Sequence, residues 1–253
     1  MKTIALNLSQ KLTMLLPVLL VLLLGQCTVL SGQGWHKYYT YEVLSHYTTA
    51  FHSIDVSPDS GIVLALNETW IYNGQIKSTS REFKIDPDGT ILWSNWYIDS
   101  LLKRRNSCII STEDDGCLVV GEQYYFDSIS VISETYFTKY DQGGKVEWDS
   151  AYSKTPIRSG DAVETPDGGY LLISNAQNSE AYVMKVDSLG KFLRDKYYSD
   201  RDYYVYEVLV NNANSCTLVG RSKDTLTNRT VGLLMTIDAN GTLWSFSFVY
   251  FII

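Results

Sequence analysis

The sequence holds few of the side chains that enzymes most often use for acid-base and metal chemistry. Its 253 residues include three histidines and four cysteines. His36, His46 and His52 all lie near the N-terminus, and no two cysteines form a C-x-x-C pair, so a zinc site has no support. The motifs G-x-S-x-G, H-E-x-x-H and G-x-x-x-x-G-K-[ST] are also missing, which removes the usual signatures of serine hydrolases, zinc proteases and phosphate-binding loops.

Positive charge is scarce as well. The chain has 21 Lys and Arg residues against 28 Asp and Glu residues, a net charge of −7. Because such a surface repels phosphate backbones, we expect no nucleic-acid partner. Apolar and aromatic residues, in contrast, make up 45% and 13% of the chain, which is enough for a packed core and excludes global disorder.

Residues 1–32 have the layout of a secretory signal peptide. Lys2 and Lys11 precede the apolar run Met14–Leu24, and a short polar patch follows it. The run is shorter than the roughly 20 residues needed to cross a bilayer, so we expect cleavage and no membrane span in the processed chain. An uncleaved anchor extended to Leu30 is the alternative. This segment predicts a secreted or cell-surface protein.

Cys27, just after the apolar run, raises the alternative of a lipid anchor. Bacterial lipoprotein signals need a small residue directly before the modified cysteine, and Gln26 stands there instead. The sequence therefore disfavours lipoprotein anchoring at Cys27.

A hairpin motif recurs along the rest of the chain. Each copy is an apolar-alternating strand, a turn rich in Asp, Asn, Ser and Gly, and a second apolar run, which is a β-hairpin pattern. The copies are SIDVSPDSGIVLAL from Ser53, IISTEDDGCLVVG from Ile109, AVETPDGGYLLIS from Ala162 and VLVNNANSCTLVG from Val208. Their turns align Asp59, Asp114, Asp167 and Ala213 in one column.

A second motif follows each hairpin, with an Asp and then a Gly three residues later. Asp can bond nearby backbone amides and Gly can adopt a positive φ, so this motif predicts a second tight turn. The copies are FKIDPDGTILW from Phe83, TKYDQGGKVEW from Thr138, MKVDSLGKFLR from Met184 and MTIDANGTLW from Met235.

Two hairpins in succession within about fifty residues predict a four-stranded unit repeated along the chain. We therefore expect an all-β fold, a β-propeller of about four four-stranded blades in a domain of residues 33–253. A single sheet of this kind buries neither face adequately, so the blades stack face to face. The expected units are residues 53–107, 108–160, 161–206 and 207–253.

The succession of T-x-D-G-G-Y, an apolar run, K-x-D-x-x-G and Trp resembles the Asp-Gly-Gly-Tyr propeller repeats of exported proteins from Bacteroidetes and some archaea. The resemblance covers roughly residues 53–250 and is clearest from Ala162 to Tyr198. It implies a secreted or surface-attached propeller, usually with no established activity. The chain departs from the pattern at Ser60, Ala213, Arg194 and Trp244, where Gly, Asp and Trp are replaced or the Trp comes one residue early.

Completeness of the ring is left open by the sequence. Residues 35–42, WHKYYTYE, resemble the end of a unit, so they are a candidate closing strand that pairs with the C-terminal blade. Four units lie at the lower limit of the usual range of blades. The chain stops at the uncharged run SFSFVYFII, although natural sheet edges are normally charged or short. We favour an incomplete or truncated ring over a closed ring of four blades.

Repeat-equivalent residues are better explained by folding than by chemistry. DPDGT, residues 86–90, has part of a calcium-loop pattern, but the equivalent turns lack its carboxylates, which favours a plain turn. Trp93 and Trp148 resemble the docking tryptophans of quinoprotein propellers, yet two equivalent tryptophans fit packing better than one cofactor site. The sequence thus names no catalytic, cofactor-binding or metal residue, and we expect no cofactor.

The three downstream cysteines give no clear disulfide framework, because their number is odd. Cys117 and Cys216 are equivalent residues two units apart and should not touch. Cys108 and Cys117 flank one hairpin, but a turn centred on Asp114 and Asp115 pairs Cys117 with Thr112. We interpret Cys117 and Cys216 as small buried side chains, with a Cys108–Cys117 bridge as the alternative.

Sequons at Asn67, Asn228 and Asn240, and the tripeptides DSI at Asp127 and DTL at Asp224, are compatible with export. The sequence predicts a non-enzymatic, monomeric, exported binding or spacer module whose partner is a protein or a glycan. The alternative is a propeller enzyme, a hydrolase or quinoprotein, with its site in the central channel. Acids and aromatics converging on the axis would favour the enzyme.

Overall fold

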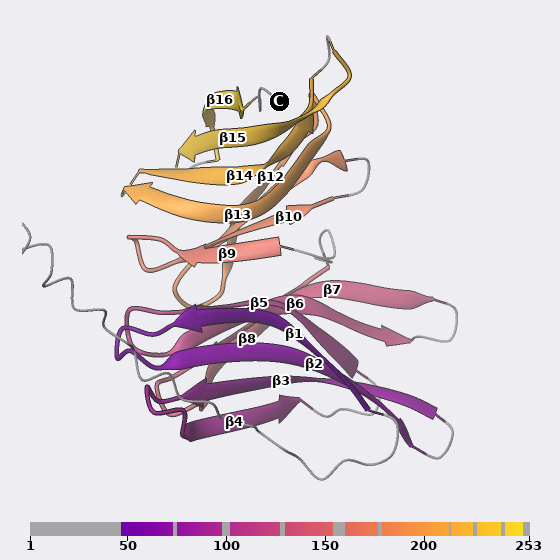
Figure 1. The fold of residues 1–253 in the computed structure, drawn as a ribbon, viewed down its shortest axis with the longest axis vertical. Helices are drawn as coiled ribbons and strands as arrows, with labels where there is room; N and C mark the ends of the chain where they lie inside the picture. Colours follow the sequence, from indigo (N-terminus) through magenta and orange to yellow (C-terminus); the bar gives the residue numbers. More distant parts are fainter. Residues whose placement is uncertain are drawn as a thin grey trace, which may run out of the picture. The chain divides into compact units, whose positions relative to one another are not determined.

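The computed structural model describes residues 47–72, 75–97, 102–126, 130–153, 160–176, 179–212, 214–224, 227–238 and 241–249. These residues all belong to one compact unit, Thr40–Ile253. They form sixteen strands in four antiparallel sheets of four strands each, and the strands follow chain order within every sheet (Figure 1). The expected all-β architecture of four four-stranded blades is confirmed.

The strands of the first two sheets are long on the axial side and shorter on the outer side. Sheet 1 contains β1 (Tyr47–Val56), β2 (Ile62–Tyr72), β3 (Gln75–Ile85) and β4 (Ile91–Tyr97). Sheet 2 contains β5 (Leu102–Ser111), β6 (Cys117–Phe126), β7 (Val131–Tyr140) and β8 (Val146–Tyr152).

The last two sheets also contain four strands each, but the innermost strand of sheet 3 is its shortest. Sheet 3 contains β9 (Gly160–Glu164), β10 (Tyr170–Asn175), β11 (Ala181–Val186) and β12 (Phe192–Tyr198). Sheet 4 contains β13 (Tyr203–Asn212), β14 (Ser215–Lys223), β15 (Thr230–Asp238) and β16 (Leu243–Val249). The final apolar run of the chain thus supplies β16, the outer edge strand of sheet 4.

The two repeated turns lie where the sequence places them. In the first turn Gly168 N–H donates to Thr165 O, and in the second Gly190 N–H donates to Asp187 O. Glycine is required at the second turn, because Gly89, Gly144, Gly190 and Gly241 all have φ between 73° and 81°. The expected pairing of Cys117 with Thr112 is wrong by one residue: Cys117 pairs with Ser111, because Thr112 N–H closes the turn on Gly116 O.

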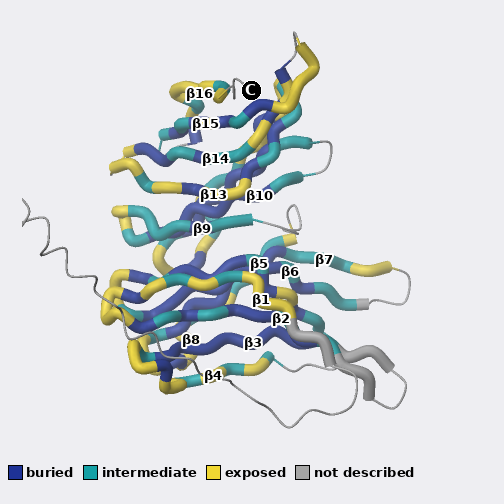
Figure 2. The backbone as a smooth tube through the Cα atoms, in the orientation of Figure 1, coloured by how far each residue is buried: buried dark blue, intermediate teal, exposed yellow. Residues whose placement is uncertain are grey.

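The core lies between consecutive sheets. Three apolar clusters fill the three junctions, one between sheets 1 and 2, one between sheets 2 and 3, and one between sheets 3 and 4. The second strands are buried on both faces, as the apolar runs predict: Leu118, Val119 and Val120 of β6 are at most 1% exposed. Figure 2 shows burial concentrated in the middle strands, with exposed residues at the turns and along β16.

We call the side of a sheet that faces the next sheet in chain order its forward face, and the opposite side its backward face. In sheet 2, Cys108, Val120 and Phe137 lie on the forward face and pack against sheet 3. Ile109 and Val119 lie on the backward face and pack against sheet 1. Every junction therefore joins a forward face to a backward face.

Several sequence interpretations fall outside the described residues. These are the signal segment 1–32 with Cys27, the candidate closing strand 35–42, and the positions Ala213, Asn240 and Asp127. No helix within the described part of the chain has the length and apolar character needed to cross a bilayer.

Candidate functional site

The aspartates of the first turn are each paired with a lysine from the third strand of the same sheet. Each carboxylate also accepts the N–H of a turn glycine or its neighbour, as expected from the sequence; Asp167, for example, accepts Gly169 N–H. The ion pairs join Lys84 to Asp59 at 2.7 Å, Lys139 to Asp114 at 2.8 Å and Lys185 to Asp167 at 2.7 Å, and the lysine side chains are 1–3% exposed.

The lysine partner was missed in the sequence, although a signal for it exists there. In the fourth unit the aspartate column holds Ala213, and the lysine column holds Thr236. The two residues are absent together in this unit, as expected for the partners of a buried ion pair, because either charge buried without the other would destabilise the fold. The first-turn aspartates are therefore structural.

The aspartates of the second turn are used in the same way in all four sheets. Asp86 Oδ1 accepts Thr90 N–H at 2.7 Å, which explains DPDGT as a turn. Asp141, Asp187 and Asp238 each accept the N–H four residues further on. Among the residues that the structure describes, no group of three or more His, Cys, Asp or Glu side chains is placed to hold a metal ion.

The two repeat-equivalent tryptophans dock onto the second turn of the following sheet. Trp93 Nε1–H donates to Gln142 O at 3.1 Å, and its indole lies against Gly144. Trp148 lies against Gly190 in the same way. The one-residue offset of Trp244 has a structural consequence, because Ser245 takes the register position opposite Thr236 that Trp93 takes opposite Lys84.

The three cysteines that the structure describes are free and buried, so the Cys108–Cys117 bridge is not formed. Burial raises the pKa of the Cys108 and Cys117 thiols well above the ordinary value, which makes both unreactive as nucleophiles. They serve as small core side chains.

Where the four innermost strands meet lies a cavity of about 430 Å³, which we call the axial cavity. Irregularities in register at Phe51/Ser53, Asn106/Cys108 and Val205/Glu207 each insert one extra residue into β1, β5 and β13. Such bulges turn an additional side chain out of the regular pattern. The cavity is lined by His52, Ser53, Ser107, Cys108, Gly160, Asp161, Tyr206, Glu207, Val208 and Leu209.

Negative charge dominates the chemistry of the axial cavity. Burial raises the pKa of Asp161; the Val208 N–H, which donates to Asp161 Oδ2 at 2.9 Å, lowers it, and the charges of Glu207 and Asp55 raise it further. The pKa of His52 is lowered by burial and by the nearby charge of Arg105, so the imidazole is neutral at pH 7. The cavity therefore places the carboxyl groups of Asp161 and Glu207 and the neutral imidazole of His52 near the exposed Tyr206.

The axial positions differ chemically from sheet to sheet. Six residues before the first-turn column stand Ser53, Cys108, Asp161 and Glu207. The residues of the turns and the docking tryptophans recur from unit to unit, as expected if they stabilise each unit. The residues of this axial column differ from unit to unit, and all four line the same cavity. The sequence named none of these side chains as site residues, because they come together only when the innermost strands of the four sheets converge and they leave no local motif.

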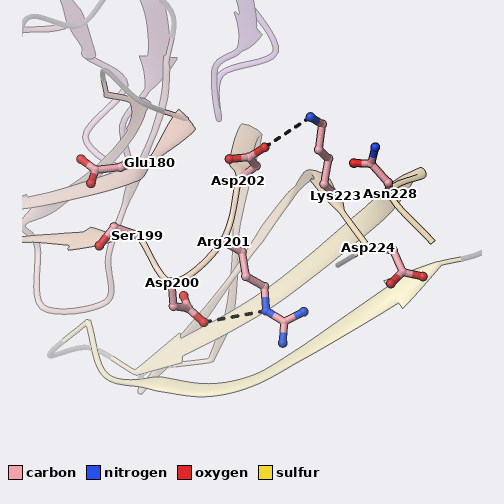
Figure 3. Close-up of a pocket in the computed structure, with 8 residues that line it drawn as sticks. All are labelled: Glu180, Ser199, Asp200, Arg201, Asp202, Lys223, Asp224 and Asn228. Atoms are coloured by element: carbon pink, nitrogen blue, oxygen red, sulfur yellow. Dashed lines mark ion pairs between the residues drawn. The ribbon is translucent and has the colours of Figure 1, made fainter. Parts of the chain in front are cut away.

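A second recess lies beside the connections of sheets 3 and 4 and measures about 570 Å³ (Figure 3). Arg201 Nε lies 3.8 Å from Asp200 Oδ2, and Lys223 Nζ lies 3.7 Å from Asp202 Oδ2. Asp224 accepts the Thr227 hydroxyl at 2.9 Å. Both cations of this recess are thus paired with carboxylates at long distance, which fits a solvated surface rather than a ligand site.

The sequons differ in accessibility. Asn67 Nδ2 donates to Asn106 O at 3.0 Å, and its Oδ1 accepts Asn106 N–H at 2.8 Å, so its amide joins sheet 1 to sheet 2. Asn228 is exposed in the loop before β15. Of the two, only Asn228 presents a free amide to a glycosylating enzyme.

A scan against protein-family models and a search of curated proteins found no match. Among solved structures the chain is similar to the hemagglutinin-neuraminidase ectodomain of parainfluenza virus 5, with a TM-score of 0.54 and 9% identity over 85% of this chain and 57% of that chain. The WD40 domain of SCAP from fission yeast matches at a TM-score of 0.32 and 9% identity over 81% and 77% of the two chains, and a eukaryotic initiation factor matches at 0.33 and 9% over 79% and 55%. The chain spans little more than half of the viral ectodomain. The likeness shows a propeller fold and nothing about activity.

Proposed function

We propose that this chain is an exported, non-enzymatic β-propeller module that binds a protein or a glycan at the cell surface through its axial cavity. The signal-like residues 1–32 support export, and the resemblance to Asp-Gly-Gly-Tyr repeats supports a module without catalytic activity. The observation that carries the proposal is the variable column at the axis. Ser53, Cys108, Asp161 and Glu207 differ although the surrounding framework repeats.

The exposed side chains of the cavity suit a hydroxyl-rich or peptide ligand. Glu207 accepts hydrogen bonds from sugar hydroxyls or amides, and Tyr206, which is 52% exposed, offers an aromatic face. A few convergent polar groups beside an aromatic ring are the usual composition of a small-ligand site.

The second candidate is a hydrolase that uses the two axial carboxyls as acid and base. The raised pKa of Asp161 and the proximity of Glu207 favour it. Against it stands the Val208 N–H, which already binds the Asp161 carboxylate and fixes it at the junction of sheets 3 and 4. Because Ser53 occupies the same column and bonds the next sheet too, Asp161 is better explained as a junction residue.

The test is binding of the full chain to printed arrays of defined oligosaccharides and of peptides. We expect retention on one array and at least a tenfold loss of affinity in Glu207→Gln and Tyr206→Ala. Asp88→Asn and Leu189→Ala are matched controls, because both side chains are exposed in turns away from the axis. Retention that survives both cavity variants would move the site elsewhere, and cleavage of an array glycan that is lost in Asp161→Asn would favour the hydrolase.

A further inference from the structure

The backward face of sheet 1 is uncovered along its innermost strand. Ile54 is 62% exposed, whereas its equivalents Ile109, Ala162 and Val208 are 1%, 4% and 4% exposed because each lies against a preceding sheet. Phe51, at 72%, is likewise open where its equivalents in sheets 2 and 4 are buried. The exposed surface of β1 is thus equivalent to the surfaces of β5, β9 and β13 that the forward face of the preceding sheet covers.

The forward face of sheet 4 is uncovered in the matching way. Leu234 is 40% exposed, although its equivalents Glu82, Phe137 and Val183 are 2%, 0% and 3% exposed. Leu209 on β13 of the same face is 55% exposed. Among the described residues, no apolar cluster joins sheet 4 to sheet 1, so both faces are open within this part of the chain.

A hydrogen bond between a side chain and the backbone recurs at the three junctions between described sheets, with the side chain as donor at the first and as acceptor at the other two. A side chain from the axial column of one sheet bonds the backbone of the residue one column further along in the next sheet. The pairs are Ser53 Oγ with Ile109 O, Cys108 Sγ with Ala162 N–H, and Asp161 Oδ2 with Val208 N–H. The remaining members of the two columns are Glu207, whose carboxylate is exposed, and Ile54.

We propose that the forward face of sheet 4 in one copy of the chain docks on the backward face of sheet 1 in a second copy. The contact repeats the internal junction: Glu207 accepts Ile54 N–H of the second copy, and Leu209 and Leu234 cover the exposed apolar side chains of β1. A second copy is the occupant because the two open faces belong to the same two columns that already pair three times within the chain. The inference goes beyond the proposed binding function and departs from the monomer expected from sequence.

The end-to-end contact is weaker than an internal junction. Sheet 4 lacks the turn ion pair and has Ser245 in place of a docking tryptophan. The junction of sheets 3 and 4 forms without that tryptophan as well, since Arg194 takes its position. There Tyr198 donates to Gly241 O, as Tyr152 donates to Gly190 O at the preceding junction. A contact between two different faces leaves one face of each kind free, so association continues into a ring or an open chain.

The experiment measures the mass of the full chain by analytical ultracentrifugation over a range of concentrations. We expect species larger than the monomer, and at least a hundredfold weaker association in Ile54→Asp and in Leu234→Asp. Both side chains are substantially exposed, so the variants should fold, which circular dichroism checks. Leu189→Asp, on a turn outside both faces and 73% exposed, is the control and should associate like the unchanged chain.

Mixing the two variants identifies the faces in contact. Each variant keeps one intact face, so Ile54→Asp mixed with Leu234→Asp should form a dimer and stop there. If Leu234→Asp alone still dimerises, the contact is sheet 1 on sheet 1 and the proposal is wrong. A chain that stays monomeric at every concentration also overturns it, whatever the outcome of the ligand arrays.

Discussion

Residues that recur from unit to unit in this chain stabilise the unit itself, and the buried lysines of sheets 1 to 3 show how. A lysine ammonium buried beneath a turn is tolerated because an aspartate and backbone carbonyls surround it; Lys139 Nζ bonds Asp114, Glu147 and Tyr140 O. The single unit without the lysine also lacks the aspartate. The lysine and the aspartate thus act together as one stabilising ion pair, although they are distant in the sequence.

The ion pair can be tested in sheet 3. Asp167→Ala leaves Lys185 buried without its counter-charge and should lower the free energy of unfolding by about 2 kcal/mol, less than for a fully buried pair because Asp167 is 62% exposed. Asp167→Ala with Lys185→Thr, which reproduces the fourth unit, should recover most of that loss. Urea unfolding of the two single variants and the double variant gives the coupling, and additive losses would contradict the pairing.

The turns between strands do two tasks at once, and Gly190 shows both. Its φ of +74° disfavours any side chain, and an added Cβ would lie 2.4 Å from the Trp148 ring. Gly168 has the same φ of +74°, but its nearest neighbour would be 4.0 Å away. The first turn only favours glycine for its backbone, since Ser60 and Asp115 hold the equivalent positions with φ of 67° and 61°. The second turn needs glycine also for contact with the preceding sheet.

Gly190→Ala should therefore cost about 2 kcal/mol more in unfolding free energy than Gly168→Ala, whose loss is about 1 kcal/mol from backbone strain. The difference measures the docking of Trp148 between sheets 2 and 3. In a Trp148→Ala background the two substitutions should cost the same, which thermal unfolding of the four variants can check. Equal losses in the unchanged background would mean that the indole moves aside freely.

The sequence predicted the elements well because each strand and turn has a local pattern. Strand alternation and the Asp and Gly residues at fixed spacing place all sixteen strands, including β16. What it missed is set by contacts between distant segments: the lysine partner of Asp114, the one-residue register at Cys117, and the bulge that exposes Tyr206. The axial cavity forms only where four strands from different sheets converge, so no pattern within a single segment of the sequence predicts it.

The whole fold is a stack of equivalent junctions with unequal chemistry. The junction of sheets 1 and 2 contains a buried polar group, Glu82, which accepts hydrogen bonds from Asn106 Nδ2 at 2.9 Å and from Tyr140. The corresponding position holds Phe137 in sheet 2 and Val183 in sheet 3. This position is therefore sensitive to protonation at the junction of sheets 1 and 2, and because the sheets stack in series the strength of that junction affects the stability of the molecule.

Glu82 and the turn aspartates make the stability of the fold depend on pH in opposite directions. Burial raises the pKa of Glu82 from 4.5 to about 7, and the hydrogen bonds from Asn106 and Tyr140 offset this only in part. A raised pKa means that the native state holds the proton more tightly, so this stabilisation is complete below pH 4.5 and is lost as the pH rises through 7. Burial raises the pKa of Asp167, but the hydrogen bonds from Lys185, Thr165 and Gly169 N–H, together with the charge of Lys185, outweigh it and bring the pKa to about 2, so the contribution of Asp167 is lost at low pH.

We therefore expect the free energy of unfolding to be highest near pH 5 and to fall by about 3 kcal/mol towards pH 8 through Glu82. Glu82→Gln keeps the shape and a hydrogen-bond acceptor for Asn106 but cannot ionise, so its stability should stay level across this range and exceed that of the unchanged chain at pH 8. Asp88→Asn, an exposed turn carboxylate, is the control and should leave the profile unchanged. Urea unfolding at a series of pH values decides it: a profile that falls equally in Glu82→Gln would assign the pH dependence to other groups, among them Asp161 and Glu164, whose pKa values are also raised.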